Sequence, residues 1–119
     1  MAHASGHHAY PRTARVNQIL REIISDELVR LSDFDEDLGL LTVTGVDTSS
    51  DLRQAVVFFD SLTEAAGSAL EAHRRQLQDA VNLQTRLKRT PKLSFRADPA
   101  VARGEAVEEI LRRQRDDDD

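Results

Sequence analysis

The stretch LKRTPKLSFRAD, residues 87–98, marks the place where a helical segment passes into a short strand, and it decides the fold. Pro91 ends the preceding helix, because the residue before a proline is displaced from the α region. The following KLSFR, residues 92–96, alternates polar and apolar side chains, which is typical of a half-buried strand. We expect Leu93 and Phe95 to face the core and the polar side chains between them to face solvent.

Upstream of this stretch, the chain has a helical pattern from Leu62 to about Lys88. A single straight helix of that length would span about 40 Å at a rise of 1.5 Å per residue, which is too long for a domain of this size. We therefore predict a break near His73–Gln76. The segment has no glycine at that point, so we expect the break to form without a positive φ.

The first half of the chain predicts a helix and a hairpin. Apolar side chains recur at three- and four-residue spacing and predict a helix at Thr13–Leu31 with one buried face. LLTVTGV, residues 40–46, and QAVVFFD, residues 54–60, are rich in β-branched and aromatic residues and predict two strands. The polar link between them is short enough for a hairpin, and Gly45 is a candidate bulge.

The predicted elements follow the order helix–strand–strand–helix–helix–strand, with a final helix at 100–115. A three-stranded sheet with the helices packed on one face buries all of these apolar patterns, so the fold class is α+β with two layers. We assign residues 11–112 to this domain, residues 1–10 to a disordered leader, and residues 113–119 to an acidic tail.

The composition narrows the class of protein. A chain of 119 residues is expected to form one domain, and the absence of cysteine excludes disulfides and thiolate metal sites. No apolar run approaches the roughly 18–20 residues of a membrane span, and the first ten residues lack the apolar stretch of a signal peptide. We expect a cytoplasmic protein with no membrane contact.

The formal net charge of −5 hides a strongly basic segment, because many of the acidic residues lie in DFDED, residues 33–37, and in the four terminal aspartates. Between Arg74 and Arg96 there are seven basic residues and one acidic residue, Asp79. Unpaired like charges repel one another unless a polyanion neutralises them, and salt screens distant acids over about 8–10 Å. This segment predicts binding to RNA phosphates.

The predicted RNA-binding surface combines the turn before the last strand, the break in the long helix and the start of the first helix. Its residues are Arg12, Arg15, Arg74, Arg75, Arg86, Lys88, Arg89, Lys92 and Arg96. Aromatic residues make up only 4% of the chain, so we expect recognition of folded RNA through phosphates and 2′-hydroxyls, without stacking of unpaired bases.

Other candidate sites are weaker. His3, His7 and His8 contain one metal-compatible spacing, but a floppy leader is a poor ligand set. The acidic residues 33–37 lack the glycine and the terminal glutamate of a calcium loop. Ser49 and Asp51 fit a hydrogen-bonded hairpin turn better than a catalytic pair. We therefore predict no enzymatic activity, no catalytic residue, no metal and no cofactor.

Three motifs resemble the ribosome-binding factor A family, and the similarity covers about residues 11–112. RTARV (12–16) opens the first helix, VDTSSDLRQAVV (46–57) spans the hairpin, and PKLSFRAD (91–98) carries the last strand. The hairpin pattern of the family is met by Val46, Ser49, Asp51, Leu52, Ala55 and Val57. Its strand pattern is met by Pro91, Leu93, Phe95 and Asp98.

The resemblance implies a type II KH-like fold and a function in ribosome biogenesis. A protein of this family is expected to associate with the free or immature 30S subunit and to assist late 16S rRNA processing near the ends of that RNA. The resemblance further implies a role in cold adaptation and release helped by a ribosome-associated GTPase. We expect a monomer.

The chain departs from the family pattern at two places. The family's Ala-x-Gly kink between the two middle helices is replaced by His73, Arg74 and Arg75, and the common Asp-Pro after the first helix is replaced by residues 33–37. The alternative function is a KH-like protein-interaction module that has lost RNA binding and meets a basic partner through the acidic loop and tail. That alternative leaves the basic segment unexplained.

Overall fold

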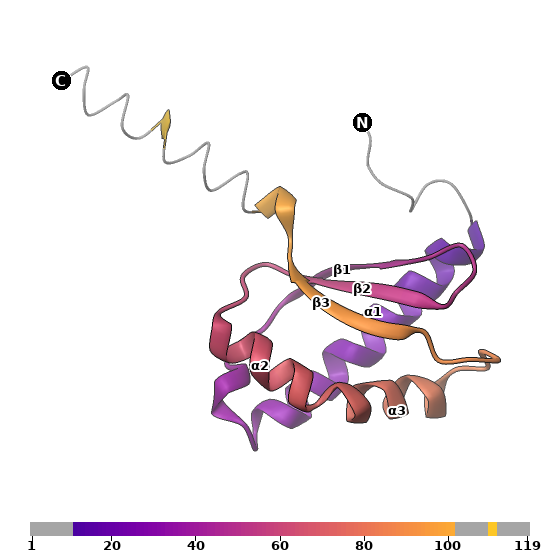
Figure 1. Cartoon of the computed structure of the whole chain (residues 1–119), viewed down its shortest axis with the longest axis horizontal. Helices are drawn as coiled ribbons and strands as arrows, with labels where there is room; N and C mark the ends of the chain where they lie inside the picture. Colours follow the sequence, from indigo (N-terminus) through magenta and orange to yellow (C-terminus); the bar gives the residue numbers. More distant parts are fainter. Residues whose placement is uncertain (1–10, 102–109, 112–119) are drawn as a thin grey trace.

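The structure, a computed structural model, describes residues 11–101 and 110–111 (Figure 1). The elements follow the predicted order. They are α1 (Pro11–Ser32), the 3₁₀ helix η2 (Glu36–Leu38), β1 (Val43–Thr48), β2 (Gln54–Phe59), α2 (Glu64–Ala72), α3 (Arg74–Gln84) and β3 (Lys92–Ala97). Residues 99–101 and 110–111 are helical, while the rest of the helix expected at 100–115, the leader and the acidic tail lie outside the described residues.

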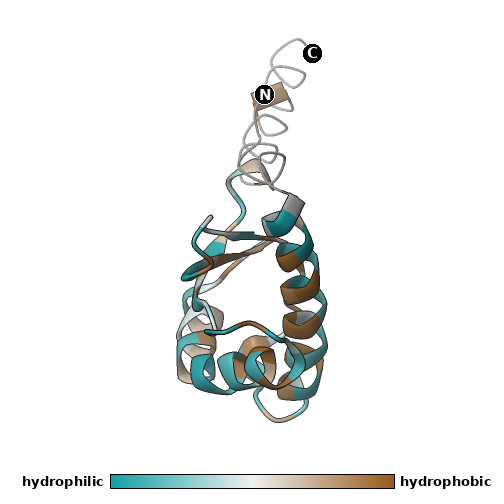
Figure 2. Cartoon of the chain, turned by 90° about the vertical axis from the view of Figure 1, so that its right-hand side faces the viewer, coloured by the Kyte–Doolittle hydropathy of each residue, from teal (hydrophilic) through white to brown (hydrophobic). Residues whose placement is uncertain are grey.

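The three strands form one sheet in the order β1-β2-β3. β1 and β2 pair antiparallel, with a register shift between Val43 and Gly45 that confirms the bulge predicted at Gly45. β2 and β3 pair parallel, so Gln54 lies opposite Lys92 and both strands begin at the same end of the sheet. The helices cover one face of the sheet, which confirms the two-layer α+β arrangement (Figure 2).

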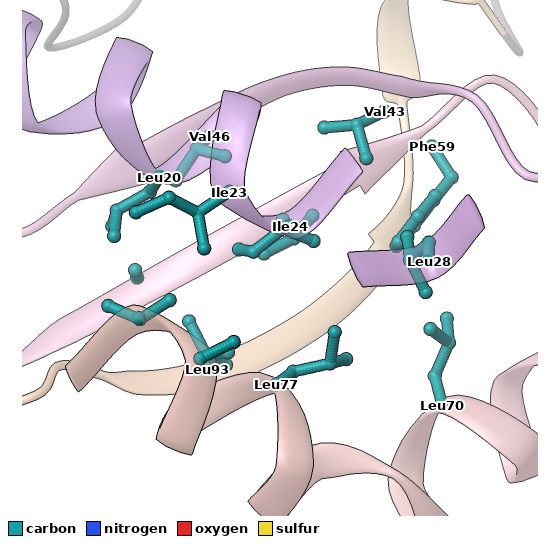
Figure 3. Close-up of a cluster of buried hydrophobic side chains, with 14 of the residues drawn as sticks. Leu20, Ile23, Ile24, Leu28, Val43, Val46, Phe59, Leu70, Leu77 and Leu93 are labelled. Carbon is teal, nitrogen blue, oxygen red and sulfur yellow. The ribbon is translucent and has the colours of Figure 1, made fainter. Parts of the chain in front are cut away.

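The core lies between the sheet and the helices (Figure 3). Its largest fully buried side chains come from every layer, and they include Leu20, Ile24, Phe59, Leu70, Leu77 and Leu93. Leu93 is therefore in the core as predicted. Phe95 is partly buried against the same cluster, with its ring centroid 6.3 Å from that of Phe59.

The long helical segment breaks at His73, within the predicted range. His73 ends α2 and begins α3 with φ −99° and ψ 7°, so the break forms without a positive φ. Its backbone N–H donates to the carbonyl oxygen of Ala69 at 3.0 Å, and its Nε2 lies 2.9 Å from Oδ2 of Asp35. The side-chain contact ties the break to the loop that follows α1.

Two element boundaries differ from the predictions by three or more residues. β1 begins at Val43, three residues later than expected, because Gly39 adopts φ 55° after η2 and Leu40 is left outside the sheet. α3 ends at Gln84, four residues before Lys88. Its buried residues stop at Val81, and Thr85 ends the helix in an extended conformation with φ −123° and ψ 163°.

Candidate nucleic-acid interface

Three segments that are far apart in the sequence meet at one end of the molecule. They are the start of α1, the turn between β1 and β2, and the loop at 85–91, all on the right of Figure 1. The parallel pairing of β2 with β3 brings the last two together, since the strands start side by side. The backbone N–H of Lys92 also donates to the carbonyl oxygen of Arg53 at 2.8 Å.

A cleft of about 410 Å³ lies where these segments meet. We call it the basic cleft. It is lined by Arg12, Asp51, Leu52, Arg53, Arg86, Leu87, Lys88 and Arg89. Five of these eight side chains are basic, and one is acidic. The cleft therefore concentrates positive charge where the whole chain carries a formal charge of −5.

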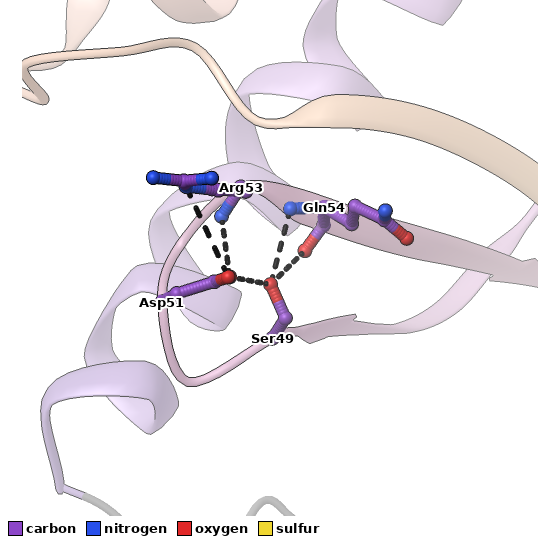
Figure 4. A network of polar contacts seen from close by, with 4 residues as sticks. All are labelled: Ser49, Asp51, Arg53 and Gln54. Atoms are coloured by element: carbon purple, nitrogen blue, oxygen red, sulfur yellow. Dashed lines mark hydrogen bonds and ion pairs between the residues drawn. The ribbon is translucent and has the colours of Figure 1, made fainter.

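The wall formed by the hairpin turn is held by a network of hydrogen bonds (Figure 4). The Ser49 hydroxyl lies 2.6 Å from Oδ1 of Asp51, and the same carboxylate oxygen accepts from the backbone N–H of Arg53 at 3.0 Å. The hydroxyl of Ser49 also accepts from the backbone N–H of Gln54 at 3.1 Å. Leu52 adopts φ 60°, and its side chain is buried in the core. This burial anchors the tip of the turn to the domain.

The electrostatics of Asp51 follow from the same contacts. The hydrogen bond from Ser49, and next the one from the backbone of Arg53, lower the pKa of Asp51 below its ordinary value. The carboxylate is therefore ionised at neutral pH and holds the turn. Its oxygen lies 4.0 Å from Nε of Arg53, and both side chains are more than half exposed, so this ion pair in water contributes little. Arg53 remains available to a ligand.

The opposite wall is the loop between α3 and β3. Leu87 packs against the core and Pro91 is fully buried, so the loop is anchored at two points. Between and beside these anchors, Arg86, Lys88 and Arg89 are exposed. Within residues 11–101, no ion pair joins these three side chains to an acidic group. Apolar anchors therefore hold basic side chains toward solvent.

The structure brings four of the nine predicted residues into the cleft: Arg12, Arg86, Lys88 and Arg89. Arg15 is exposed one turn further along α1, and Lys92 is exposed at the start of β3. Arg96 is exposed further along that strand, so β3 carries its positive charge on the side of the sheet away from Leu93. These residues could extend the basic surface beyond the cleft.

The two arginines at the break lie apart from the cleft. Arg74 and Arg75 open α3, whereas the cleft begins after its last residue, and eleven helical residues span about 16 Å. Arg74 is half-buried and forms an ion pair with Glu71, while Arg75 is exposed. The structure therefore does not gather the break and the turn into one cleft.

Sequence reasoning missed Arg53, which lies outside the basic segment at 74–96. A signal was available. Arg53 immediately precedes β2 and Lys92 opens β3, so parallel pairing of the two strands brings these basic residues to the same end. The antiparallel alternative would have placed them at opposite ends of the sheet.

The order α-β-β-α-α-β, with helices on one face of a three-stranded sheet, defines a type II KH-like domain, here with a basic cleft at one end. The chain belongs to the ribosome-binding factor A family, whose sequence profile matches residues 12–111. Ribosome-binding factor A of Rubrobacter xylanophilus is 43% identical over 105 residues, which cover 85% of each chain.

Solved structures agree with this assignment. The crystal structure of ribosome-binding factor A from Thermus thermophilus matches with a TM-score of 0.63 at 30% identity, covering 70% of this chain and 92% of that chain. A homology model of the Thermus thermophilus protein, fitted into a cryo-EM map of a 30S complex, matches with a TM-score of 0.56 at 31% identity. That match covers 66% of this chain and 86% of the other.

In the part of the chain that the structure describes, no helix has the length and apolar character needed to cross a bilayer. Within the same residues, no three His, Cys, Asp or Glu side chains are grouped so that they could share a metal ion.

Proposed function

We propose that this protein binds the immature 30S small ribosomal subunit and assists late 16S rRNA processing and subunit maturation. Its family is that of ribosome-binding factor A, and a homology model of a relative 31% identical to it was fitted into a map of a 30S complex. The observation that carries the proposal is the basic cleft, where five basic side chains from three segments converge. RNA phosphates are the polyanion that such a cleft on a ribosome-binding protein would meet.

The chemistry of the cleft suits backbone recognition. Arginine can hold a phosphate through two parallel hydrogen bonds, and each charge-assisted hydrogen bond contributes roughly 1.5–3 kcal/mol. Both walls are anchored in the core, through Leu52 on one side and through Leu87 and Pro91 on the other. Side chains on anchored walls lose less freedom on binding, so the cleft is preorganised for one arrangement of RNA.

The mechanism we propose is occupancy. A protein that binds one arrangement of the rRNA more tightly than another shifts the population toward the first, without catalysing a reaction. Binding at an immature site would also delay the entry of that subunit into translation. The Ser49–Asp51 pair beside the cleft is engaged in the hairpin turn, which supports a binding role for this region.

Residues 11–112 form the ribosome-binding domain, and the protein acts as a monomer in the cytoplasm. A ribosome-associated GTPase promotes its release, and its absence is most harmful in the cold. The alternative, a module that has lost RNA binding, is not favoured, because Arg86, Lys88 and Arg89 would then be held in the open without a partner.

The proposal is tested by cosedimentation of the full chain with purified immature 30S subunits. We expect Lys88→Glu with Arg89→Glu to weaken binding severely, by about tenfold or more for each lost phosphate contact. The single variant Arg89→Glu is measured as well, with Arg21→Glu as its control. Both side chains are exposed, and both substitutions change the charge by the same amount. Parental affinity in the double variant would place the RNA face elsewhere, and failure of the parent protein to cosediment would overturn the proposed function.

A further inference from the structure

The end of the molecule opposite the basic cleft exposes apolar side chains. α1 is 22 residues long and separates the two ends by about 33 Å. At its far end, Val29 is 67% exposed, Phe34 is 89% exposed and Leu40 is 100% exposed. We call these three residues, together with the acidic Asp33, Glu36 and Asp37, the acidic-apolar end. In Figure 1 the loop after α1 lies at the lower left, away from the start of α1, the β1–β2 turn and the loop before β3 at the right.

The loop that carries these side chains is held in place. The backbone N–H groups of Phe34 and Asp35 donate to the carbonyl oxygen of Leu31 at 3.0 and 2.9 Å. The carboxylate of Asp35 accepts from the backbone N–H of Asp37 at 3.1 Å and contacts Nε2 of His73 at 2.9 Å. Leu38 is buried, and Gly39 turns the chain with φ 55°. Phe34 is therefore exposed on a loop whose backbone is held by hydrogen bonds.

Two of the three apolar side chains, Val29 and Leu40, border a small groove. It has a volume of about 100 Å³ between the last turns of α1 and the segment after η2. That volume has room for a single side chain of a partner, not for a helix. Large apolar side chains held at a surface next to a groove are typical of a protein–protein contact.

Charge decides which kind of partner fits. Asp33, Glu36 and Asp37 are exposed, and across residues 11–101 no ion pair joins any of them to a basic group. Of the basic residues close to this loop, Arg30 is engaged by Glu27 at 2.7 Å and Arg74 by Glu71. Arg75 is exposed two residues after His73, which contacts Asp35. Uncompensated carboxylates repel RNA phosphates and attract lysine and arginine. The surface is thus unsuited to RNA and complementary to a basic protein.

We propose that the acidic-apolar end docks on a basic protein segment of the 30S particle, a segment rich in lysine or arginine that inserts one apolar side chain beside Val29 and Leu40. The inference rests on the proposed function and names a second contact on the same particle. The two ends of α1 then contact different components of the particle. The basic cleft binds RNA, and the acidic-apolar end binds protein.

A photo-crosslinking experiment tests the inference. p-Benzoylphenylalanine replaces Phe34 in the full chain, which is bound to purified immature 30S subunits and irradiated. A second chain carries the same group in place of Leu83, which is 84% exposed on the last turn of α3 next to the cleft. Cosedimentation is measured first for both chains, and the crosslinked products are then separated into protein and RNA adducts.

The expected result is a discrete protein adduct at position 34, mapping to a basic segment, and no adduct to that protein from position 83. Adducts to rRNA alone, no adduct, or an adduct to an acidic segment would each overturn the inference while leaving the proposed function intact. Crosslinking of position 34 to a second copy of the chain, in the absence of subunits, would show that this end is a self-association surface and would also overturn it. If neither chain cosediments, the proposed function fails, and the inference fails with it.

A pair of variants gives an independent measurement. Asp33→Lys with Asp37→Lys should weaken subunit binding about tenfold at low salt, although both changes add positive charge. If RNA faced this end, the same changes would strengthen binding, because each would add a phosphate contact. The direction of the change therefore separates a protein contact from an RNA contact, and unchanged affinity would contradict any contact at this end.

Discussion

The backbone N–H of Lys92 donates to the carbonyl oxygen of Arg53 at 2.8 Å, one residue before the parallel pairing of Gln54 with Lys92 begins. This bond joins the hairpin turn to the loop that leads into β3. The bond places Arg53, which lies outside the basic segment at 74–96, beside the residues of that segment. The two walls of the basic cleft are therefore neighbours in one hydrogen-bonded sheet, and their spacing is set by the backbone.

Arg53 should contribute to RNA binding as much as the predicted residues do. We expect Arg53→Glu to weaken binding to immature 30S subunits to about the same extent as Arg89→Glu, because both side chains line the cleft. The measurement is the affinity at several salt concentrations. Each lost phosphate contact should lower the slope of log affinity against log salt by roughly 0.7–0.9. Parental slope and affinity in Arg53→Glu would remove this residue from the interface.

The break between α2 and α3 offers a test of how far the RNA surface extends. Arg75 is exposed in the first turn of α3, a helix about 16 Å long whose other end leads into the loop that lines the cleft. If the RNA surface includes the break, as the sequence predicts, Arg75→Glu weakens subunit binding in the same assay as Arg89→Glu. Arg21→Glu is again the control of equal charge. Binding equal to the parent would confine the surface to the cleft and its edges.

Substitution of Leu93 should lower the stability of the fold without removing any side chain that lines the cleft. Its side chain is fully buried, so Leu93→Ala is expected to cost about 2–5 kcal/mol in the free energy of unfolding. Denaturant melts followed by circular dichroism measure that cost. Lys88→Glu with Arg89→Glu should leave the same melts nearly unchanged, since exposed residues contribute little. A small cost for Leu93→Ala would contradict its place in the core.

The hairpin turn should lose stability at low pH in a way that depends on Ser49. The folded pKa of Asp51 lies below its ordinary value, so the stabilisation by the ionised carboxylate is present above about pH 4. It is lost as the pH falls through the folded pKa. We expect Ser49→Ala to raise the pKa of Asp51, measured by NMR titration, because the largest cause of its depression is removed. An unchanged pKa in that variant would show that the backbone N–H of Arg53 dominates instead.

The contact between His73 and Asp35 should couple the break to the loop after α1. A double-mutant cycle of His73→Ala and Asp35→Ala is expected to give a coupling free energy of about 0.5–1.5 kcal/mol, as for a typical hydrogen bond. The cycle is needed because Asp35 also accepts from the backbone of Asp37, so its single substitution removes more than one contact. A coupling near zero would mean that backbone bonds alone hold the break.

The elements that sequence predicted well depend on local patterns. The apolar spacing of α1 and the bulge at Gly45 follow from a few neighbouring residues, whereas the break at His73 follows from the length of the helical segment. The end of α3 was predicted too late because Pro91 only excludes helix close to itself. The helix ends at Gln84 because Thr85 adopts an extended conformation, and Leu87 contacts the core from the loop that follows.

The candidate site was harder to predict because it is assembled from distant segments. The excess of basic residues around Arg86 and Arg89 was visible in the sequence, and the structure places both in the cleft. The inclusion of Arg53 depends on a parallel strand pairing that no local pattern specifies. The separation of Arg74 from the cleft likewise depends on the packing of α3 and on the ion pair with Glu71.

The parallel pairing of β2 with β3 has a consequence for the newly made chain. Arg12 is translated early and Arg89 late, and the loop that carries Arg89 is fixed only when residues 92–97 pair with β2. While those last residues are still inside the exit tunnel, the cleft does not exist, and the basic side chains are spread along an unfinished chain. The basic cleft thus forms late, only once β3 has emerged and paired with β2.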